Sequence, residues 1–156
     1  MSPAAVTASG YIESLELMGM QFGLDRMHAL MRALDHPEQR FDAIHVVGSN
    51  GKSSTVRFCE ALLEAEGVAS GAYTSPHLTT FRERIRIGGE TIGEQAYERA
   101  VLEVRDSGIE LTQFEALTGA AFVGFAAAGV EVGWSRRGWA AASMPPTCSA
   151  ARPCRC

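Results

Sequence analysis

Apolar residues recur at helical spacing along several stretches of the chain. After Asp25, a good N-cap residue, four apolar positions between 27 and 34 lie three or four residues apart and predict a helix that ends before Pro37. Residues 52–66 predict an amphipathic helix, with Gly67 placed to end it. Further helices are predicted over residues 11–18, 94–106 and 113–127.

Short apolar runs between glycines or polar turns predict strands. The run FDAIHVV at 41–47 is typical of a strand buried on both faces, and residues 68–73 predict a second strand. Residues 84–87 and 91–92 flank a pair of glycines as in a small hairpin, and valines at 130 and 132 indicate the start of another strand. The succession strand, glycine turn, helix, strand is typical of an α/β fold with a parallel sheet.

Composition narrows the class of protein. The chain has 156 residues, 46% of them hydrophobic, with a net charge of −4, which argues against a nucleic-acid-binding protein. No apolar run reaches the length of about 18 residues that a membrane span needs, so no membrane partner is expected. Of the four cysteines only Cys59 precedes residue 134, which fits a cytoplasmic protein.

The last part of the chain differs in composition from the rest. Residues 134–156 hold four Arg and three Cys but no Asp, Glu, Leu, Ile, Val or Phe, so they lack the aliphatic side chains of a core element. The spacing of these cysteines fits no common zinc pattern. We expect residues 1–133 to form the N-terminal part of a larger domain and residues 134–156 to be a frame-shifted, unstructured tail, with a genuine divergent tail as the alternative.

The strongest motif is GSNGKSST at residues 48–55, between a predicted strand and a predicted helix. Glycines let the backbone turn its N–H groups towards phosphate oxygens, and the following helix presents its N-terminus to the same anion. Lys52, the only lysine among 14 basic side chains, would reach the β- and γ-phosphates, and a hydroxyl from Ser53 or Ser54 could meet Mg²⁺. The motif predicts nucleotide binding.

Three segments in order, IHVVGSNGKSS, YTSPHLTTFRERI and FEALTGAAFVGF, resemble folylpolyglutamate synthase/dihydrofolate synthase of the Mur ligase superfamily over residues 11–133. The resemblance implies an incomplete α/β domain of the Mur ligase central type, with ATP and Mg²⁺ as cofactors. It also implies a monomeric ligase that joins glutamate to a folate or pteroate carboxylate through an acyl phosphate. Because the family has further strands and a second α/β domain, we expect these residues alone to be inactive.

The resemblance also implies roles for single residues. Ser54 and Ser75 match positions near Mg²⁺; Lys52 and His77 match catalytic positions, with ordering of its loop as the alternative for His77. Arg84, Thr112 and Phe114 match positions near the pterin pocket, with core packing as the alternative for Phe114. The nucleotide loop is matched by Gly48, Ser49, Asn50, Gly51, Lys52, Ser53 and Ser54, although the family usually has Thr at position 49 and Gly at position 53.

The resemblance bears on the tail as well. In the family an acidic residue that helps to hold Mg²⁺ stands at the end of the next strand, and its place is taken here by Arg136. A single lost base near the codons for residues 133 and 134 accounts for this substitution. Two other functions stay open: a stand-alone nucleotide-binding module without ligase activity, and a P-loop kinase, against which the TSPHL and FE segments argue.

Overall fold

The computed structural model describes residues 7–15, 25–46 and 50–136. Within them the chain alternates helices and strands, as the sequence predicts for an α/β fold. No helix in these ranges is long and apolar enough to cross a membrane. The helices are α1 (Ala8–Ser14), α2 (Asp25–Ala33), α3 (Lys52–Ala65), α4 (Glu94–Asp106) and α5 (Gln113–Ala128), with short 3-10 turns η2 (Pro37–Arg40) and η3 (Phe81–Arg84).

Within the described ranges five strands form one sheet: β1 (Asp42–Val46), β2 (Ser70–Tyr73), β3 (Ile85–Ile87), β4 (Glu90–Thr91) and β5 (Val132–Arg136), in the order β1-β5-β2-β3-β4. Strand β5 pairs in parallel with both β1 and β2, which confirms the predicted parallel sheet. The β3–β4 hairpin adds two antiparallel strands beside β2 and confirms the predicted turn at the glycine pair. Because the parallel strands run the same way, the carboxyl ends of β1 and β2 lie at one edge of the sheet.

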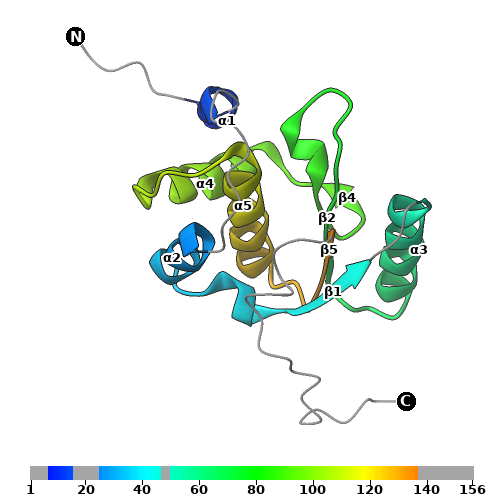
Figure 1. The fold of residues 1–156 in the computed structure, drawn as a ribbon. Helices are drawn as coiled ribbons and strands as arrows, with labels where there is room; N and C mark the ends of the chain where they lie inside the picture. The colour runs from blue at the N-terminus through cyan, green and yellow to red at the C-terminus, as the bar shows by residue number, and fades with distance from the viewer. Residues whose placement is uncertain (1–6, 16–24, 47–49, 137–156) are drawn as a thin grey trace.

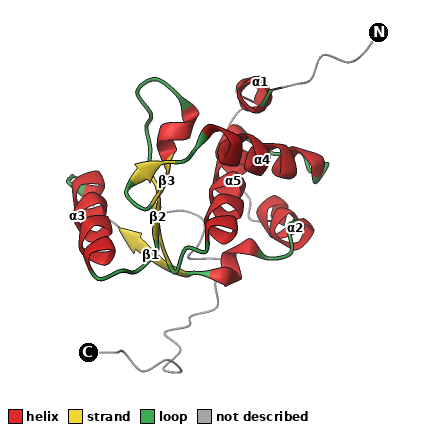
Figure 2. Ribbon diagram, turned by 180° about the vertical axis from the view of Figure 1, so that it is seen from behind, coloured by secondary structure: helices red, strands yellow, loops and turns green. Residues whose placement is uncertain are grey.

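Helices cover the sheet unequally. Among the described elements, α3 lies alone on one face, while α5 lies on the other with α1, α2 and α4 around it (Figure 1; seen from behind in Figure 2). Eleven of the sixteen residues of α5 are buried, and most are Ala, Gly, Leu, Val or Phe. The main hydrophobic core therefore forms between α5, its neighbouring helices and the sheet.

Two glycines let aromatic rings lie directly on the sheet. Gly71 and Gly133 are opposite each other on β2 and β5. A Cβ on Gly71 would lie 2.7 Å from the Phe125 ring, and one on Gly133 would lie 2.8 Å from the Phe41 ring. The two rings themselves meet edge to face, with centroids 5.5 Å apart. The absence of a side chain at both positions sets how closely α5 approaches the sheet.

The exposed side of the sheet differs from expectation. The strand at 41–47 is predicted to be buried on both faces, yet Ile44 is 41% exposed because β1 lies at the edge of the described sheet. On α3, Phe58 and Leu62 are 73% and 67% exposed, although their spacing is that of a core-facing pair. Helix α3 therefore rests on the sheet through a narrow strip.

The boundary predicted between residues 133 and 134 falls inside β5. Residues 134 and 135 pair with both β1 and β2, and Arg136 pairs with β1. Strand pairing uses backbone groups and therefore needs no aliphatic side chain. Trp134 is buried against Val56 and Ala72, so an aromatic side chain makes the core contact for which an aliphatic one is expected from the sequence. The first three residues of the predicted tail thus belong to the sheet, and the rest lies outside the described residues.

Candidate functional site

The site begins where α3 starts. Gly51 precedes the helix with φ of +78°, a left-handed conformation that glycine adopts without strain. Its carbonyl accepts hydrogen bonds from the Thr55 N–H (2.9 Å) and the Thr55 hydroxyl (3.0 Å), which close the first helical turn. The N–H groups of that first turn point out of the helix end, where an anion is favoured. Of the predicted nucleotide loop, Gly48 and Ser49 lie outside the described residues.

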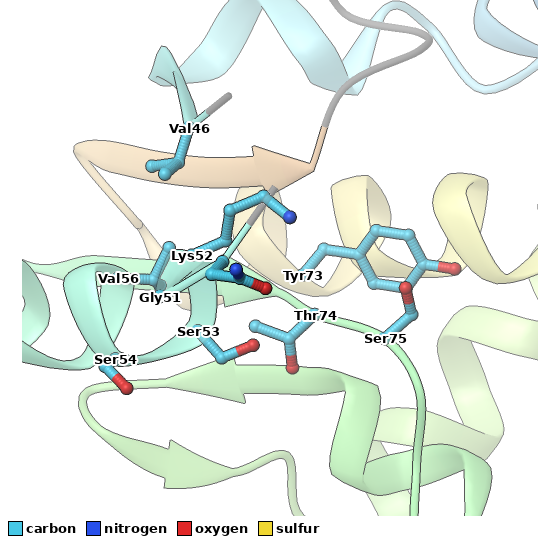
Figure 3. A pocket seen from close by; sticks show the side chains of 10 residues that line it. Val46, Gly51, Lys52, Ser53, Ser54, Val56, Tyr73, Thr74 and Ser75 are labelled. Atoms are coloured by element: carbon cyan, nitrogen blue, oxygen red, sulfur yellow. The ribbon is translucent and has the colours of Figure 1, made fainter. Parts of the chain in front are cut away.

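A pocket of about 300 Å³ opens at this helix end. One wall comes from the end of β1 and the start of α3, and the other from the end of β2 and the residues after it (Figure 3). The structure thus brings together two motifs that are more than twenty residues apart in sequence. The lining residues are Val46, Asn50, Gly51, Lys52, Ser53, Ser54, Val56, Tyr73, Thr74 and Ser75.

Most of the polar side chains in the pocket carry hydroxyls, and Lys52 supplies the one amine of the lining. In Figure 3 the Lys52 side chain extends from α3 towards the side on which Tyr73 and Ser75 lie. In the same view the Ser53 hydroxyl points towards Thr74, whereas the Ser54 side chain points away from Lys52. Both serines line the pocket, and the role of either hydroxyl as a metal ligand stays a prediction.

This set of groups fits a nucleotide with its metal ion. A helix N-terminus and one ammonium group match phosphate oxygens, which accept hydrogen bonds and carry negative charge. Mg²⁺ is held in such sites by few protein oxygens together with phosphates and water, and serine hydroxyls from both walls are present. The pocket can therefore hold a polyphosphate from one side and its metal ion from the other.

The loop after Ser75 is ordered by Glu83. Its carboxylate accepts hydrogen bonds from the N–H groups of Leu78 (2.9 Å), Thr79 (3.1 Å) and Thr80 (2.9 Å). These backbone hydrogen bonds lower the pKa of Glu83 below its ordinary value, because they favour the charged form. Thr80 and Glu83 also form a capping box at the start of η3. One carboxylate thus fixes the loop that follows the pocket.

His77 and Arg84 contact each other. The Nε of Arg84 donates to Nδ1 of His77 at 2.8 Å, and the imidazole ring lies 4.5 Å from the Phe81 ring centroid. The Arg84 guanidinium lies 5.6 Å from the same ring. Because Nδ1 accepts this hydrogen bond, the ring carries its proton on Nε2. The geometry gives His77 a place in loop ordering, and its catalytic role stays a prediction.

The other two predicted substrate residues lie at the start of α5. Thr112 caps the helix: its hydroxyl accepts from the Glu115 N–H (3.3 Å) and donates to the Glu115 carboxylate (2.9 Å). Arg26 of α2 pairs with the same carboxylate at 3.2 Å. Phe114 is 40% exposed, so it is not an ordinary core residue, and its ring lies 6.2 Å from that of Tyr73. Phe114 is therefore placed beside a pocket residue, while Thr112 is engaged in capping.

Sequence reasoning missed Tyr73 and Thr74 as site residues. Burial raises the pKa of Tyr73, and it raises the pKa of the neighbouring Tyr97 to about 12, so both phenols are neutral at physiological pH. Their signal in the sequence is position alone: Tyr73 is the last residue of a predicted strand and directly precedes the TSPHL segment. Residues at the carboxyl end of a parallel strand commonly line a site in α/β folds.

Comparison with known proteins gives a consistent result. No family model matches the chain. A dihydrofolate synthase/folylpolyglutamate synthase of Bacillus subtilis is 37% identical in an alignment of 134 residues that covers 81% of this chain and 31% of that protein. The protein of the same name from Escherichia coli is 34% identical over 116 residues, 73% of this chain and 27% of that protein.

Solved structures show the same likeness. Mycobacterium tuberculosis folylpolyglutamate synthase complexed with ADP matches with a TM-score of 0.75 and 32% identity, covering 85% of this chain and 32% of that one. Escherichia coli FolC in complex with DHPP and ADP matches with a TM-score of 0.78 and 30% identity, covering 88% and 34%. A bifunctional synthase with Mn, AMPPNP and L-glutamate bound also has a TM-score of 0.78. The chain spans about a third of the length of these structures.

Proposed function

Because four-fifths of this chain is homologous to the folylpolyglutamate synthases and dihydrofolate synthases, the family to which it belongs, we propose that its pocket binds ATP with Mg²⁺. One observation carries the proposal: the helix end with Lys52 and the strand end with Ser75 form opposite walls of one pocket. Structures of the homologous region have been solved with ADP and with AMPPNP and Mn.

The residues of the pocket have distinct tasks in this proposal. Backbone N–H groups at Gly51 and the start of α3 hold phosphate oxygens, and Lys52 adds a compact positive charge. Hydroxyls of Ser53 or Ser54 on one wall and of Ser75 on the other contribute oxygen ligands for the metal ion. ATP with its metal ion supplies the phosphoryl group that activates a carboxylate for amide formation. Phe114, with its exposed ring near Tyr73, stacks on the flat ring of a folate or pteroate substrate.

The ligase reaction belongs to a longer polypeptide in this proposal. The whole reaction joins glutamate to a folate carboxylate, and this chain corresponds to about a third of the relatives named for it. We propose that the 156 residues bind the nucleotide but do not by themselves complete the ligation. A monomeric, cytoplasmic state is part of this proposal, and the cysteine usage before residue 134 supports the cytoplasmic location.

Nucleotide binding is tested by thermal unfolding and calorimetry of the full chain. With AMPPNP and Mg²⁺ at a hundred times Kd, binding to the folded state adds about 2.7 kcal/mol to the free energy of unfolding and raises the melting temperature by several degrees. A stand-alone binding module gives the same shift in melting temperature. Its ATP turnover, however, is not stimulated by folate and glutamate when the rest of a homologous synthase is added. Absence of any shift at saturating nucleotide contradicts the proposal.

A further inference from the structure

A buried ion pair ties α3 to the β3–β4 hairpin. The Nε of Arg86, on β3, lies 3.2 Å from a carboxylate oxygen of Glu60, on α3. The side chains are 18% and 2% exposed, so this pair is largely removed from water. Arg86 also donates to the carbonyl of Gly89 in the turn between β3 and β4. Helix and hairpin are therefore joined through one guanidinium group.

Few other contacts hold α3 in place. Val56 and Glu60 are its two buried residues, and the apolar cluster beneath it has three buried members, Val56, Ala72 and Trp134. Cys59 and Leu63 are partly buried against this cluster, whereas Phe58 and Leu62 are exposed. A buried carboxylate is a large part of what fixes this helix, although burying charge is costly in itself.

Stability alone does not account for the pair. Burial raises the pKa of Glu60, with Arg86 only partly opposing that effect, and the second carboxylate oxygen is buried without a hydrogen-bond partner among the described residues. Apolar residues of similar size at such positions are commonly as stable as a buried ion pair. What a charged pair adds is a fixed direction and distance, since its hydrogen bonds are lost when either element moves.

The position of the pair links it to the pocket. Arg86 is opposite Ala72 in the β2–β3 register. Ala72 in turn stands three residues before Ser75 in the sequence. Glu60 lies eight residues after Lys52 on the same helix, about 12 Å along its axis. Fixing Glu60 to Arg86 therefore fixes the wall that carries Lys52 relative to the wall that carries Ser75.

We propose that Glu60 and Arg86 are positioning residues that set the spacing between the phosphate-binding wall and the metal-binding wall of the pocket. This inference rests on the proposed nucleotide function. The phosphate contacts lie on the loop and α3 and move together, so they tolerate a shift of the helix. A metal ion held between phosphate and Ser75 needs both walls in register, so its contribution to nucleotide affinity depends on the pair.

The test compares AMPPNP affinity with and without Mg²⁺ by calorimetry. In Glu60→Gln and Arg86→Gln we expect affinity without metal to change less than about twofold, while the gain produced by Mg²⁺ falls about five- to tenfold, in line with ordinary coupling energies. Ser75→Ala is expected to lose the same gain. Asp35→Asn, which breaks the exposed Asp35–Arg40 pair, is the matched control and is expected to retain it.

The outcomes are separable. A wild-type chain that binds no nucleotide overturns the proposed function and this inference with it. If the wild type binds nucleotide and the folded Glu60 and Arg86 variants keep the same Mg²⁺-dependent gain in affinity, the inference alone is overturned. A merely structural pair lowers the melting temperature and leaves the Mg²⁺ gain unchanged. Arg86→Lys keeps the buried positive charge and is the variant to use if the glutamine variants fail to fold; it is expected to show a smaller loss of the same gain.

Discussion

At the scale of single residues, Lys52 and Ser75 differ in what places them in the pocket: the local helix start for Lys52 and the tertiary fold for Ser75. Lys52 is the first residue of α3, so its ammonium group is carried at the helix N-terminus, where an anion is favoured. Ser75, by contrast, is one of several serines in the chain, and its place in the pocket follows from the fold.

The Lys52 ammonium is expected to supply a charge-assisted hydrogen bond to phosphate. Lys52→Ala should lower AMPPNP–Mg²⁺ affinity about ten- to hundredfold, since hydrogen bonds to charged groups are worth about 1.5–3 kcal/mol. Lys52→Arg should restore only part of the affinity, because the guanidinium is larger and planar. Arg57→Ala, an exposed position on the same helix, is the control, and calorimetry is the measurement. Equal affinity of the alanine variants at 52 and 57 contradicts the assignment.

At the scale of elements, the loop between β2 and β3 depends on a carboxylate rather than on burial. Residues 78–80 are exposed, and their backbone N–H groups donate to the carboxylate of Glu83 in η3. His77, Phe81 and Arg84 stack beside it. The loop is therefore held by local polar contacts, which respond to pH and to single substitutions.

Glu83→Gln is expected to loosen this loop without unfolding the protein. In the wild type, the pKa of Glu83 is lowered, so its contribution is present above the ordinary carboxyl value of 4.5 and is lost as pH falls through the lowered value. Amide resonances of residues 78–80 should titrate with a midpoint below 4.5 in the wild type and not in the variant, whose amides should exchange faster at pH 7.

The matched control for that experiment is Glu98→Gln, an exposed position on α4. It should leave the exchange of residues 78–80 and their titration unchanged. If the Glu83 variant retains both the wild-type exchange rates and the titration, the loop is ordered by other contacts.

At the scale of the whole molecule, the sheet separates a thick layer from a thin one. Helix α5 with its neighbours buries most of the core on one face, and α3 covers the other face with a small cluster. The pocket lies at the edge where β1 and β2 end, between the start of α3 and the residues after β2. The thick layer thus holds most of the core, and the thin layer supplies one wall of the pocket.

The close approach of α5 to the sheet gives a stability prediction. Gly71→Ala places a methyl group against the Phe125 ring and is expected to lower the free energy of unfolding by about 1–3 kcal/mol, the usual cost of overpacking. Gly93→Ala is the control, because a Cβ there meets nothing within 4 Å. Denaturant unfolding measures both variants. A Gly71 variant as stable as the Gly93 variant means that the helix can move away from the sheet without cost.

The sequence by itself determined the local elements and the nucleotide motif. The helix at 94–106 was predicted with the bounds that α4 has. The glycine before α3 and the two hairpin glycines have positive φ angles, as their predicted places in turns require. These features depend on neighbours a few residues away: apolar spacing, capping groups and positive φ angles at glycine.

Tertiary structure alone decided which distant residues share a site and which apolar residues are covered. Tyr73 and Thr74 join Lys52 in one pocket because β1, β5 and β2 lie in a parallel order that brings their carboxyl ends together. The Glu60–Arg86 pair connects a helix and a strand that are 26 positions apart. Phe58 and Leu62 have the spacing of core residues, yet the described fold places nothing over them. Such contacts depend on how elements pack across the sheet, and no short stretch of sequence encodes that arrangement.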